Sequence, residues 1–320
     1  MMNPNRRQIN CLLAEGQNTI HVFGAAIGYP WGRYALYHAA QMRCRMGLMM
    51  EAADPDGWKA PFRWVKYSLL QTLFGKQLQF VLAMGAQGVR WFKKCGFPSE
   101  KIFPFAYIVE NPDYLISRPV REDLKRVFHI LFVGQLISRK RVDLLIRAIA
   151  YIAEDNILLS IVGDGPEHKR LKKLAAHLGV GHLISWLGAL PNAKVREFLT
   201  TADLLILPSQ YDGWGAVVNE ALMAGTPVIC TDHCGAADLL QEKWRGEVVP
   251  RNNLTALISA IKRRLAEGPI KQKHREKIKN WAECITGSSA AAYLESVFAH
   301  VYQGKSRPNP PWCAIKENID

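Results

Sequence analysis

Short apolar runs alternate with helical patterns along most of the chain. In the second part, runs of strand length lie at residues 128–135, 157–165, 182–188, 204–209 and 226–232, and each is followed by a helix or a turn. In the first part, similar runs at 19–25, 47–52 and 79–85 are separated by helical stretches around 33–45 and 60–77. Strands that alternate with helices form parallel sheets covered by helices on both faces. The pattern therefore predicts an α/β protein.

One looser segment divides the pattern into two parts. Residues 108–126 contain two prolines and a charge run, which are typical of a linker. We expect a domain at 1–110, a linker at 111–126, a second domain at 127–268, and C-terminal helices and a tail at 269–320 that pack back on the N-terminal domain. With three predicted strands, the first domain is an incomplete Rossmann-like half, and two such domains would face a cleft.

The stretch "YDGWGAVVNEALMAGTPVI" at residues 211–229 predicts a helix with two carboxylates near its ends. The helix should begin near Gly215 or Ala216 and end at Gly225, where glycine suits the C-cap and the following proline forbids continuation. Gly213 and Gly215 let the backbone approach a ligand closely, and the free amides of the first turn suit an anion. The segment thus predicts a phosphate position flanked by Asp212 and Glu220.

Helical spacing places Glu220 at the margin of the buried face of this helix. Val217, Ala221 and Ala224 share the buried stripe, and Asn219 falls on the opposite side. A carboxylate that only contacts solvent would sit where Asn219 does. The alternative makes Asp212 a loop or capping residue and Glu220 the partner of a lysine, and these residues alone leave both readings open.

The net charge of +13 is concentrated in the first third of the chain, where 13 Lys and Arg face 6 Asp and Glu over residues 1–110. Within it, residues 60–78 place Phe62, Val65, Leu69 and Leu73 on one helical stripe, with Leu70 and Phe74 beside it and Arg63, Lys66 and Lys76 at the edges, and residues 90–94 add "RWFKK". A cationic amphipathic surface of this kind suits anionic lipid headgroups, so Ala60–Leu78 and Arg90–Lys94 predict contact with a membrane surface. The alternative is a core-facing helix with a solvated basic side. Without a recognisable binding motif, the charge does not predict a nucleic-acid partner.

Composition narrows the class of protein. With 320 residues, 49% hydrophobic and 22% charged, the chain is typical of a folded two-domain protein. It lacks an apolar stretch of about 18 residues and an N-terminal apolar core suited to a signal peptide, which predicts a cytoplasmic protein, peripheral on the inner face of the cytoplasmic membrane. Seven scattered cysteines predict reduced thiols, because "CTDHC" at 230–234 has no second ligand pair at zinc spacing.

The second part of the chain, from Phe128 to Glu267, resembles the C-terminal half of retaining glycosyltransferases of family 4, which have the GT-B fold. The resemblance rests on four segments in this order: "FVGQLISRKRVDLLIRAIAYI", "LLSIVGDGPEHKRLKKLA", "ISWLGALPNAKVREFLTTADLLILPS" and "DGWGAVVNEALMAGTPVICTDHCGAADLL". It implies two Rossmann-like domains and a UDP- or GDP-linked sugar donor. The family's N-terminal domain is longer and often carries a histidine where this chain has Glu51 to Asp54, so a shortened enzyme, a fragment or a degenerate relative is expected.

The resemblance also implies roles for matching residues. Lys140, in the segment that follows Gly134, would contact the donor diphosphate. The family often has Arg directly after the strand glycine, where this chain has Gln135, and Arg139 would compensate for the missing charge. Asp212 would bind hydroxyls of the transferred sugar, and Glu220 would bind the ribose hydroxyls of the nucleotide.

The rest of the implied donor site is backbone around the start of the predicted helix. Amides near Gly215, Ala216 and Val217 would bind the diphosphate, and Gly213 and Trp214 complete the donor-binding set. Asp212, Glu220 and Lys140 form the implied catalytic set.

The implied reaction is transfer of a glycosyl group with retention to a saccharide or lipid-linked saccharide acceptor, in bacterial surface polysaccharide biosynthesis. Lys140 and the helix amides would stabilise the diphosphate leaving group, so neither a metal nor a cofactor is expected. The "DPD" at 54–56 has the letters of a metal motif but is predicted to form a turn. The alternatives are a non-catalytic glycosyltransferase-like protein that binds a nucleotide or a partner, and a sugar-nucleotide epimerase of related fold.

Overall fold

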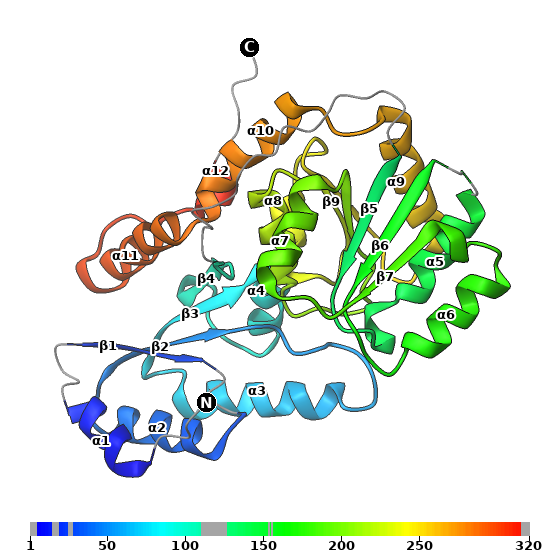
Figure 1. The fold of residues 1–320 in the computed structure, drawn as a ribbon. Coiled ribbons are helices and arrows are strands. Elements are labelled where there is room, and N and C mark those ends of the chain that lie inside the picture. The colour runs from blue at the N-terminus through cyan, green and yellow to red at the C-terminus, as the bar shows by residue number, and fades with distance from the viewer. Residues whose placement is uncertain are drawn as a thin grey trace. The chain divides into compact units, whose positions relative to one another are not determined.

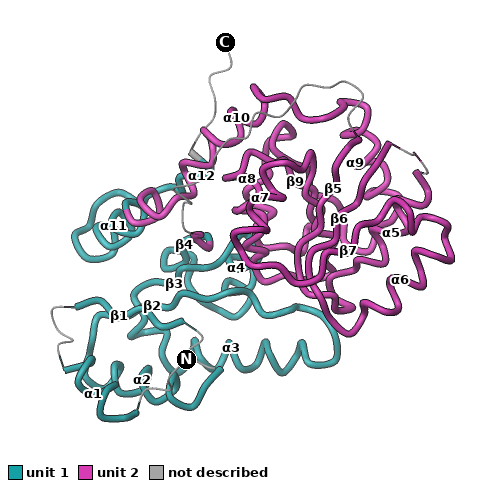
Figure 2. The backbone as a smooth tube through the Cα atoms, viewed as in Figure 1, with its two compact units in different colours: residues 1–106, 292–320 teal, residues 107–291 magenta. Residues whose placement is uncertain are grey.

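The computed structural model describes residues 5–14, 19–24, 28–109, 127–152, 154 and 156–314. The chain divides into two compact units (Figure 2), one formed by residues 1–106 with 292–320 and the other by residues 107–291. The predicted linker at 111–126 lies outside the described residues.

The first unit contains a parallel sheet of four strands in the order β1-β2-β3-β4 (Figure 1). The strands are β1 (Ile20–Gly24), β2 (Arg45–Met50), β3 (Leu78–Met84) and β4 (Ile102–Phe105). The three predicted strands are confirmed within about two residues at each end. β4 was not predicted because it contains Pro104, and proline lacks the N–H that a central strand needs. At the edge of the sheet, where β4 lies, a proline is tolerated.

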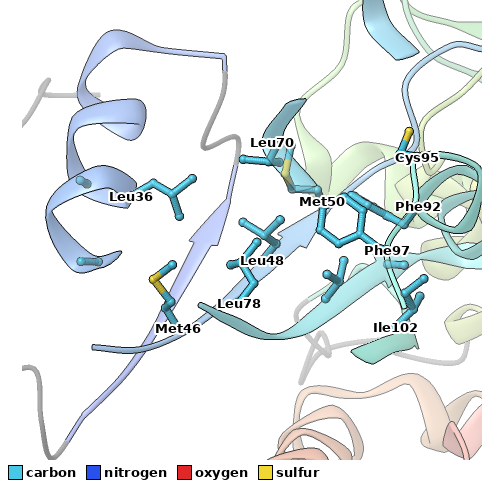
Figure 3. Close-up of a cluster of buried hydrophobic side chains, with 14 of the residues drawn as sticks. Leu36, Met46, Leu48, Met50, Leu70, Leu78, Phe92, Cys95, Phe97 and Ile102 are labelled. Carbon is cyan, nitrogen blue, oxygen red and sulfur yellow. The ribbon is translucent and has the colours of Figure 1, made fainter. Parts of the chain in front are cut away.

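Four helices supply the side chains that pack on one face of this sheet. They are α1 (Arg6–Ala14), α2 (Pro30–Gln41), α3 (Ala60–Phe74) and α4 (Gly85–Lys94). Their buried side chains form one core cluster with β2 and β3 (Figure 3), which includes Leu36 of α2, Met46 and Leu48 of β2, Leu70 of α3 and Phe92 of α4. The cluster explains why the sequence patterns at 33–45 and 60–77 both produce helices, although each ends a few residues earlier than predicted.

The other face of the sheet carries Phe80, Leu82 and Phe105, since alternate strand residues point to opposite faces. Helix α11 (Gly287–Gln303) contacts this face, with the rings of Phe298 and Phe80 centred 5.3 Å apart. The Tyr293 hydroxyl donates to the Pro104 carbonyl at 3.0 Å, which ties the helix to β4. A last short helix, α12 (Pro311–Ala314), follows. The sheet of the first unit therefore has helices on both faces.

The second unit contains a parallel sheet of six strands in the order β10-β9-β8-β5-β6-β7. The strands are β5 (Phe128–Val133), β6 (Ile157–Val162), β7 (Ile184–Gly188), β8 (Leu204–Leu207), β9 (Val228–Thr231) and β10 (Gly246–Val249). The helices are α5 (Val142–Ile152), α6 (His168–His177), α7 (Asn192–Thr201), α8 (Ala216–Met223), α9 (Leu254–Glu267) and α10 (Gln272–Ala282). The five predicted strands are confirmed, and β10 was not predicted because its sequence, GEVV, has only two consecutive apolar strand formers. Single-turn 3₁₀ helices occur at Ser99–Lys101, Ser138–Lys140, Gly181–Leu183 and Glu283–Ile285, with a longer one at Gly235–Leu240.

The strand order reverses direction between β5 and β8. The chain builds the sheet outward from β5 to β7 and then returns to the other side of β5 with β8, β9 and β10. The Asp203 carboxylate fixes the start of this central pair, because it accepts from the amides of His129, at 2.9 Å, and Ile270, at 3.1 Å. In open α/β sheets, ligands bind at the carboxyl ends of the strands where the order reverses.

Among the described residues, we find no helix long and apolar enough to cross a membrane.

Candidate functional site

An ion pair joins the two loops that leave the central strands. Lys140 lies in the 3₁₀ turn after β5, and its ammonium group donates to Asp212, which follows β8. The two side chains are only 13% and 12% exposed. The structure thus brings together two predicted site residues at the point where the strand order reverses.

Backbone contacts hold the same two loops together beside the ion pair. The Arg139 guanidinium donates to the Tyr211 carbonyl at 3.0 Å, and the Gln210 amide donates to the Arg139 carbonyl at 2.8 Å. Apart from this contact, the Arg139 side chain is exposed. The Gln135 side chain is exposed as well. Neither side chain is buried in the protein, so both remain accessible to a ligand at the mouth of these loops.

Close backbone packing forms the floor of the site. A Cβ on Gly163 would lie 1.9 Å from the Gly134 carbonyl oxygen, so only glycine fits where the loops after β5 and β6 meet. Gly134 in turn lies beside Lys140, whose Cε would be 3.9 Å from an added Cβ. Lys140 therefore extends over a surface made of backbone.

The helix α8 begins where the pattern predicts, with Gly215 as its N-cap. Gly215 has a φ of 88°, and a Cβ there would lie 2.8 Å from the Cys234 sulfur. The next two residues, Ala216 and Val217, are exposed and half-buried, and first-turn amides have no acceptor within their own helix. The start of α8 thus offers amides and the positive end of the helix dipole to an anion. No side chain caps the helix, so Asp212 does not have the capping role of the alternative.

The Trp214 indole is 2% exposed and lies in the interior of the second unit. Its Nε1 donates to the Asn219 side chain at 2.7 Å, and Asn219 donates to the Tyr107 carbonyl at 2.9 Å. The prediction that Asn219 lies opposite the buried stripe is wrong, because Asn219 is fully buried to satisfy the indole and that carbonyl. Trp214, one of the predicted donor-binding residues, therefore offers a ligand almost no surface, whereas Gly213 is half-buried and offers its backbone.

Glu220 is half-buried on α8, and burial raises the pKa of its carboxyl group above the ordinary value. The Arg196 guanidinium of α7 acts in the opposite direction on the pKa, more weakly. A carboxylate that has lost part of its water accepts hydrogen bonds from a ligand at a smaller desolvation cost than an exposed one. The cation that acts on the pKa of Glu220 is thus Arg196 of the preceding helix α7, and not a lysine as in the alternative.

Two buried cysteines support the loop around Trp214. The Cys234 thiol donates to the Trp214 carbonyl at 2.9 Å. A hydrogen bond with Cys234, together with burial, raises the pKa of the Cys230 thiol well above its ordinary value. The Cys230 thiol is therefore a neutral packing group near the site. Asn219 and Cys234 were not predicted as parts of the site, and only their positions next to the Gly-Trp-Gly segment could have drawn attention to them.

The "DPD" of the first unit forms the predicted turn. The Asp54 carboxylate accepts from the Asp56 amide at 3.1 Å, which is a local turn interaction.

Comparison with known proteins gives the family. A model of the family "Glycosyl transferases group 1" matches residues 118–283, which is slightly more than half of the chain. An uncharacterized glycosyltransferase of Methanocaldococcus jannaschii is 34% identical over 145 residues, covering 45% of this chain and 36% of the relative. The amylovoran biosynthesis glycosyltransferase AmsK of Erwinia amylovora is 26% identical over 181 residues, covering 54% of this chain and 44% of the relative. The chain thus spans between about a third and a half of the length of these relatives.

A solved structure extends the likeness to most of the chain. The structure of Anabaena HepE in complex with UDP has a TM-score of 0.71 at 16% identity, covering 92% of this chain and 82% of that one. At this identity the likeness shows the fold, and the predicted α/β class with two Rossmann-like parallel-sheet domains of the GT-B type is confirmed. By its sequence from residue 118 to 283, the chain belongs to the glycosyl transferases group 1 family.

Proposed function

We propose that the second unit binds a nucleoside-diphosphate sugar and that the protein transfers the sugar to an acceptor hydroxyl. The observation that carries the proposal is the ion pair between Lys140 and Asp212 at the reversal of strand order, next to the start of α8. A diphosphate needs cations and amide donors, and a sugar needs acceptors for its hydroxyls. Here a cation, Lys140, is in contact with an acceptor, Asp212, and the amide donors are those at the start of α8.

The ion pair would be exchanged when a donor binds. The diphosphate attracts Lys140 and the first-turn amides of α8, which frees Asp212 to accept from the hydroxyls of the sugar. Glu220, partly stripped of water, accepts from the ribose hydroxyls. Gln135 and Arg139 are exposed at the mouth of the loops and add donors to the phosphate oxygens.

The same groups would serve the reaction. As the glycosyl bond breaks, negative charge grows on the diphosphate, and a fixed cation and helix amides stabilise that charge more in the transition state than in the bound donor. Transfer with retention and without a metal or cofactor follows the resemblance of the second unit to family 4. A UDP-linked donor is supported by the UDP bound in HepE, and GDP is the other base to test.

The proposed acceptor is a saccharide, carried on a lipid, in the assembly of a bacterial surface polysaccharide at the inner face of the cytoplasmic membrane. Its support is that the relative AmsK is named for amylovoran biosynthesis.

Calorimetric titration of the full chain with UDP, GDP and their common sugar conjugates tests donor binding. We expect one base to bind, and Glu220→Ala and Lys140→Ala to weaken its binding at least tenfold, while the exposed lysine variant Lys173→Ala has no effect. Absence of binding from a folded sample contradicts the proposal. Turnover is then followed with and without a saccharide acceptor. A new sugar nucleotide formed without an acceptor would indicate an epimerase. A glycosylated acceptor with retained anomeric configuration would indicate a retaining transferase.

A further inference from the structure

Helix α3 of the first unit turns only a narrow face toward the core. Leu70 is its one buried residue and belongs to the core cluster (Figure 3). Tyr67 and Phe74, on the same side of the helix, are half-buried and pack against that cluster. These three residues form the inward face of α3, which packs against the core cluster.

A second apolar face of α3 is exposed. Phe62, Val65, Leu69 and Leu73, here called the α3 stripe, are 70%, 47%, 54% and 64% exposed. At about 100° per residue the stripe spans about 80° and is centred roughly 120° away from the inward face. The prediction that these four residues share a stripe is confirmed. The alternative in which the stripe faces the core is wrong, because Leu70, Tyr67 and Phe74 take that place.

A tryptophan precedes the stripe at the start of the helix. Trp58 is 78% exposed in the preceding turn, with the Lys59 ammonium 4.9 Å from its ring centre. Trp64 lies about 145° around the helix from the centre of the stripe, and its Nε1 donates to the Lys94 carbonyl at 3.1 Å. The basic end of α4, with the segment "RWFKK", therefore lies beside another side of α3.

The segment that contains α3 and α4 carries charge of one sign. Residues 57–99 contain seven Lys and Arg and no Asp or Glu. Six of the seven are exposed: Lys59, Lys66, Lys76, Arg90, Lys93 and Lys94. The seventh, Arg63, is turned inward and donates to the Asp54 carbonyl at 2.8 Å.

We propose that the α3 stripe and the exposed cations beside it, Lys59, Lys66 and Lys76, bind the surface of an anionic phospholipid bilayer, with α3 lying in the headgroup layer. Exposed aliphatic and aromatic side chains flanked by lysines match that layer, which is apolar beneath and anionic above. A second copy of this chain is a poor occupant, because pairing the two stripes would bring together two faces that hold only positive charge. The inference rests on the first unit alone and stands whether or not the second unit binds a nucleotide.

Flotation of the full chain with vesicles tests the apolar part of the proposal. We expect binding to vesicles of phosphatidylcholine with about one third phosphatidylglycerol, and at least tenfold weaker binding of Phe62→Gln/Leu69→Gln/Leu73→Gln, since burial of each such side chain contributes about 1.5–3 kcal/mol when complete. The matched control Leu12→Gln removes a side chain of similar exposure, 66%, from α1 and should bind like the wild type.

Charge reversal tests the electrostatic part. Lys66→Glu/Lys76→Glu, which reverses two exposed charges beside the stripe, should bind at least 25-fold more weakly, because each cation near an anionic surface is worth about 1 kcal/mol, or roughly fivefold. The control Lys169→Glu/Lys173→Glu makes the same change in exposed lysines of α6 and should reduce binding far less. Binding should also fall between about 0.1 M and 1 M salt, as the Debye length shortens from about 10 to 3 Å.

Three outcomes overturn the proposal. They are no binding to anionic vesicles, equal binding by the stripe variant with an unchanged circular dichroism spectrum, and equal binding to vesicles of phosphatidylcholine alone. If the triple variant does not fold, vesicle binding by the single variant Leu73→Gln and by the double lysine variant tests the proposal instead. A wild-type protein that dimerises through the stripe, and becomes monomeric in the stripe variant without binding vesicles, assigns the surface to a second copy.

Discussion

The ion pair between Lys140 and Asp212 gives the sharpest test of the site. Removing one partner from a buried pair costs about 3–5 kcal/mol, because the other charge stays without compensation. Since these side chains keep about an eighth of their exposure, we expect Lys140→Met and Asp212→Asn each to lower the free energy of unfolding of the second unit by about 2–3 kcal/mol. The double variant leaves no unpaired charge, so its cost should be well below the sum, with a coupling energy of about 2 kcal/mol.

Urea denaturation of the four proteins of this cycle measures the coupling. Because the chain has two units, the transition must be assigned to the second unit, for example by hydrogen exchange of the α8 amides. A coupling energy below about 0.5 kcal/mol, the level found for independent sites, would refute the ion pair as a feature of the folded protein.

The same variants separate the two proposed roles in donor binding. Lys140→Met should weaken nucleoside diphosphate binding roughly tenfold to hundredfold, the usual worth of a hydrogen bond to a charged group. Asp212→Asn should leave nucleoside diphosphate binding unchanged or stronger, because Lys140 no longer has to leave its partner, and should abolish any preference for the sugar conjugate. Equal losses for diphosphate and conjugate in Asp212→Asn would contradict the exchange of the ion pair.

Three further predictions concern the surroundings of the site. Because burial raises the pKa of Glu220, ionisation of its carboxyl group favours unfolding. The free energy of unfolding should therefore fall as the pH rises from the ordinary glutamate range through the raised pKa, and nucleotide binding should strengthen over the same pH interval. In Glu220→Gln, both quantities should lose this dependence on pH. Gly215→Ala places a Cβ 2.8 Å from the Cys234 sulfur at a positive φ and should lower the unfolding free energy by at least about 1 kcal/mol, measured by thermal denaturation against the tolerated control Gly181→Ala, whose Cβ meets nothing within 4 Å. Arg275 donates buried hydrogen bonds to the Thr226 hydroxyl, at 2.8 Å, and to the Ala202 carbonyl, at 2.7 Å. Arg275→Met removes both bonds and should lower the free energy of unfolding by about 2–4 kcal/mol in the same assay. Unchanged stability would mean that these bonds contribute little.

Local chemistry predicted the site where it is built from one stretch of chain. The ends of α8 follow from Gly215 and Gly225, both with positive φ, and the order of apolar runs gave five strands of the second sheet. The adjacency of Lys140 and Asp212 depends on β8 pairing with β5, which no single run of sequence encodes. The resemblance to a family assigned both residues to one donor site but did not predict their contact.

Periodicity predicted shared faces but not which face is buried. The α3 stripe has the spacing of a core face, and the three residues that contact the core lie on another side of the same helix. Asn219 is the opposite case, since a polar residue is buried to serve a neighbouring indole and a carbonyl 112 positions away. In both cases at least one partner is distant in sequence, so a local pattern cannot identify the buried face.

The reversal of strand order has a consequence for how the site forms during folding. Lys140 and Asp212 are 72 positions apart, and the strands that carry them meet only after β6 and β7 have been laid down on the far side of β5. Contacts of such long range are slow to form, since loop closure must precede them. A chain emerging during synthesis therefore has no part of the proposed donor site to offer until β8 has formed, and a nucleotide that binds there would accelerate only the last steps of folding of the second unit.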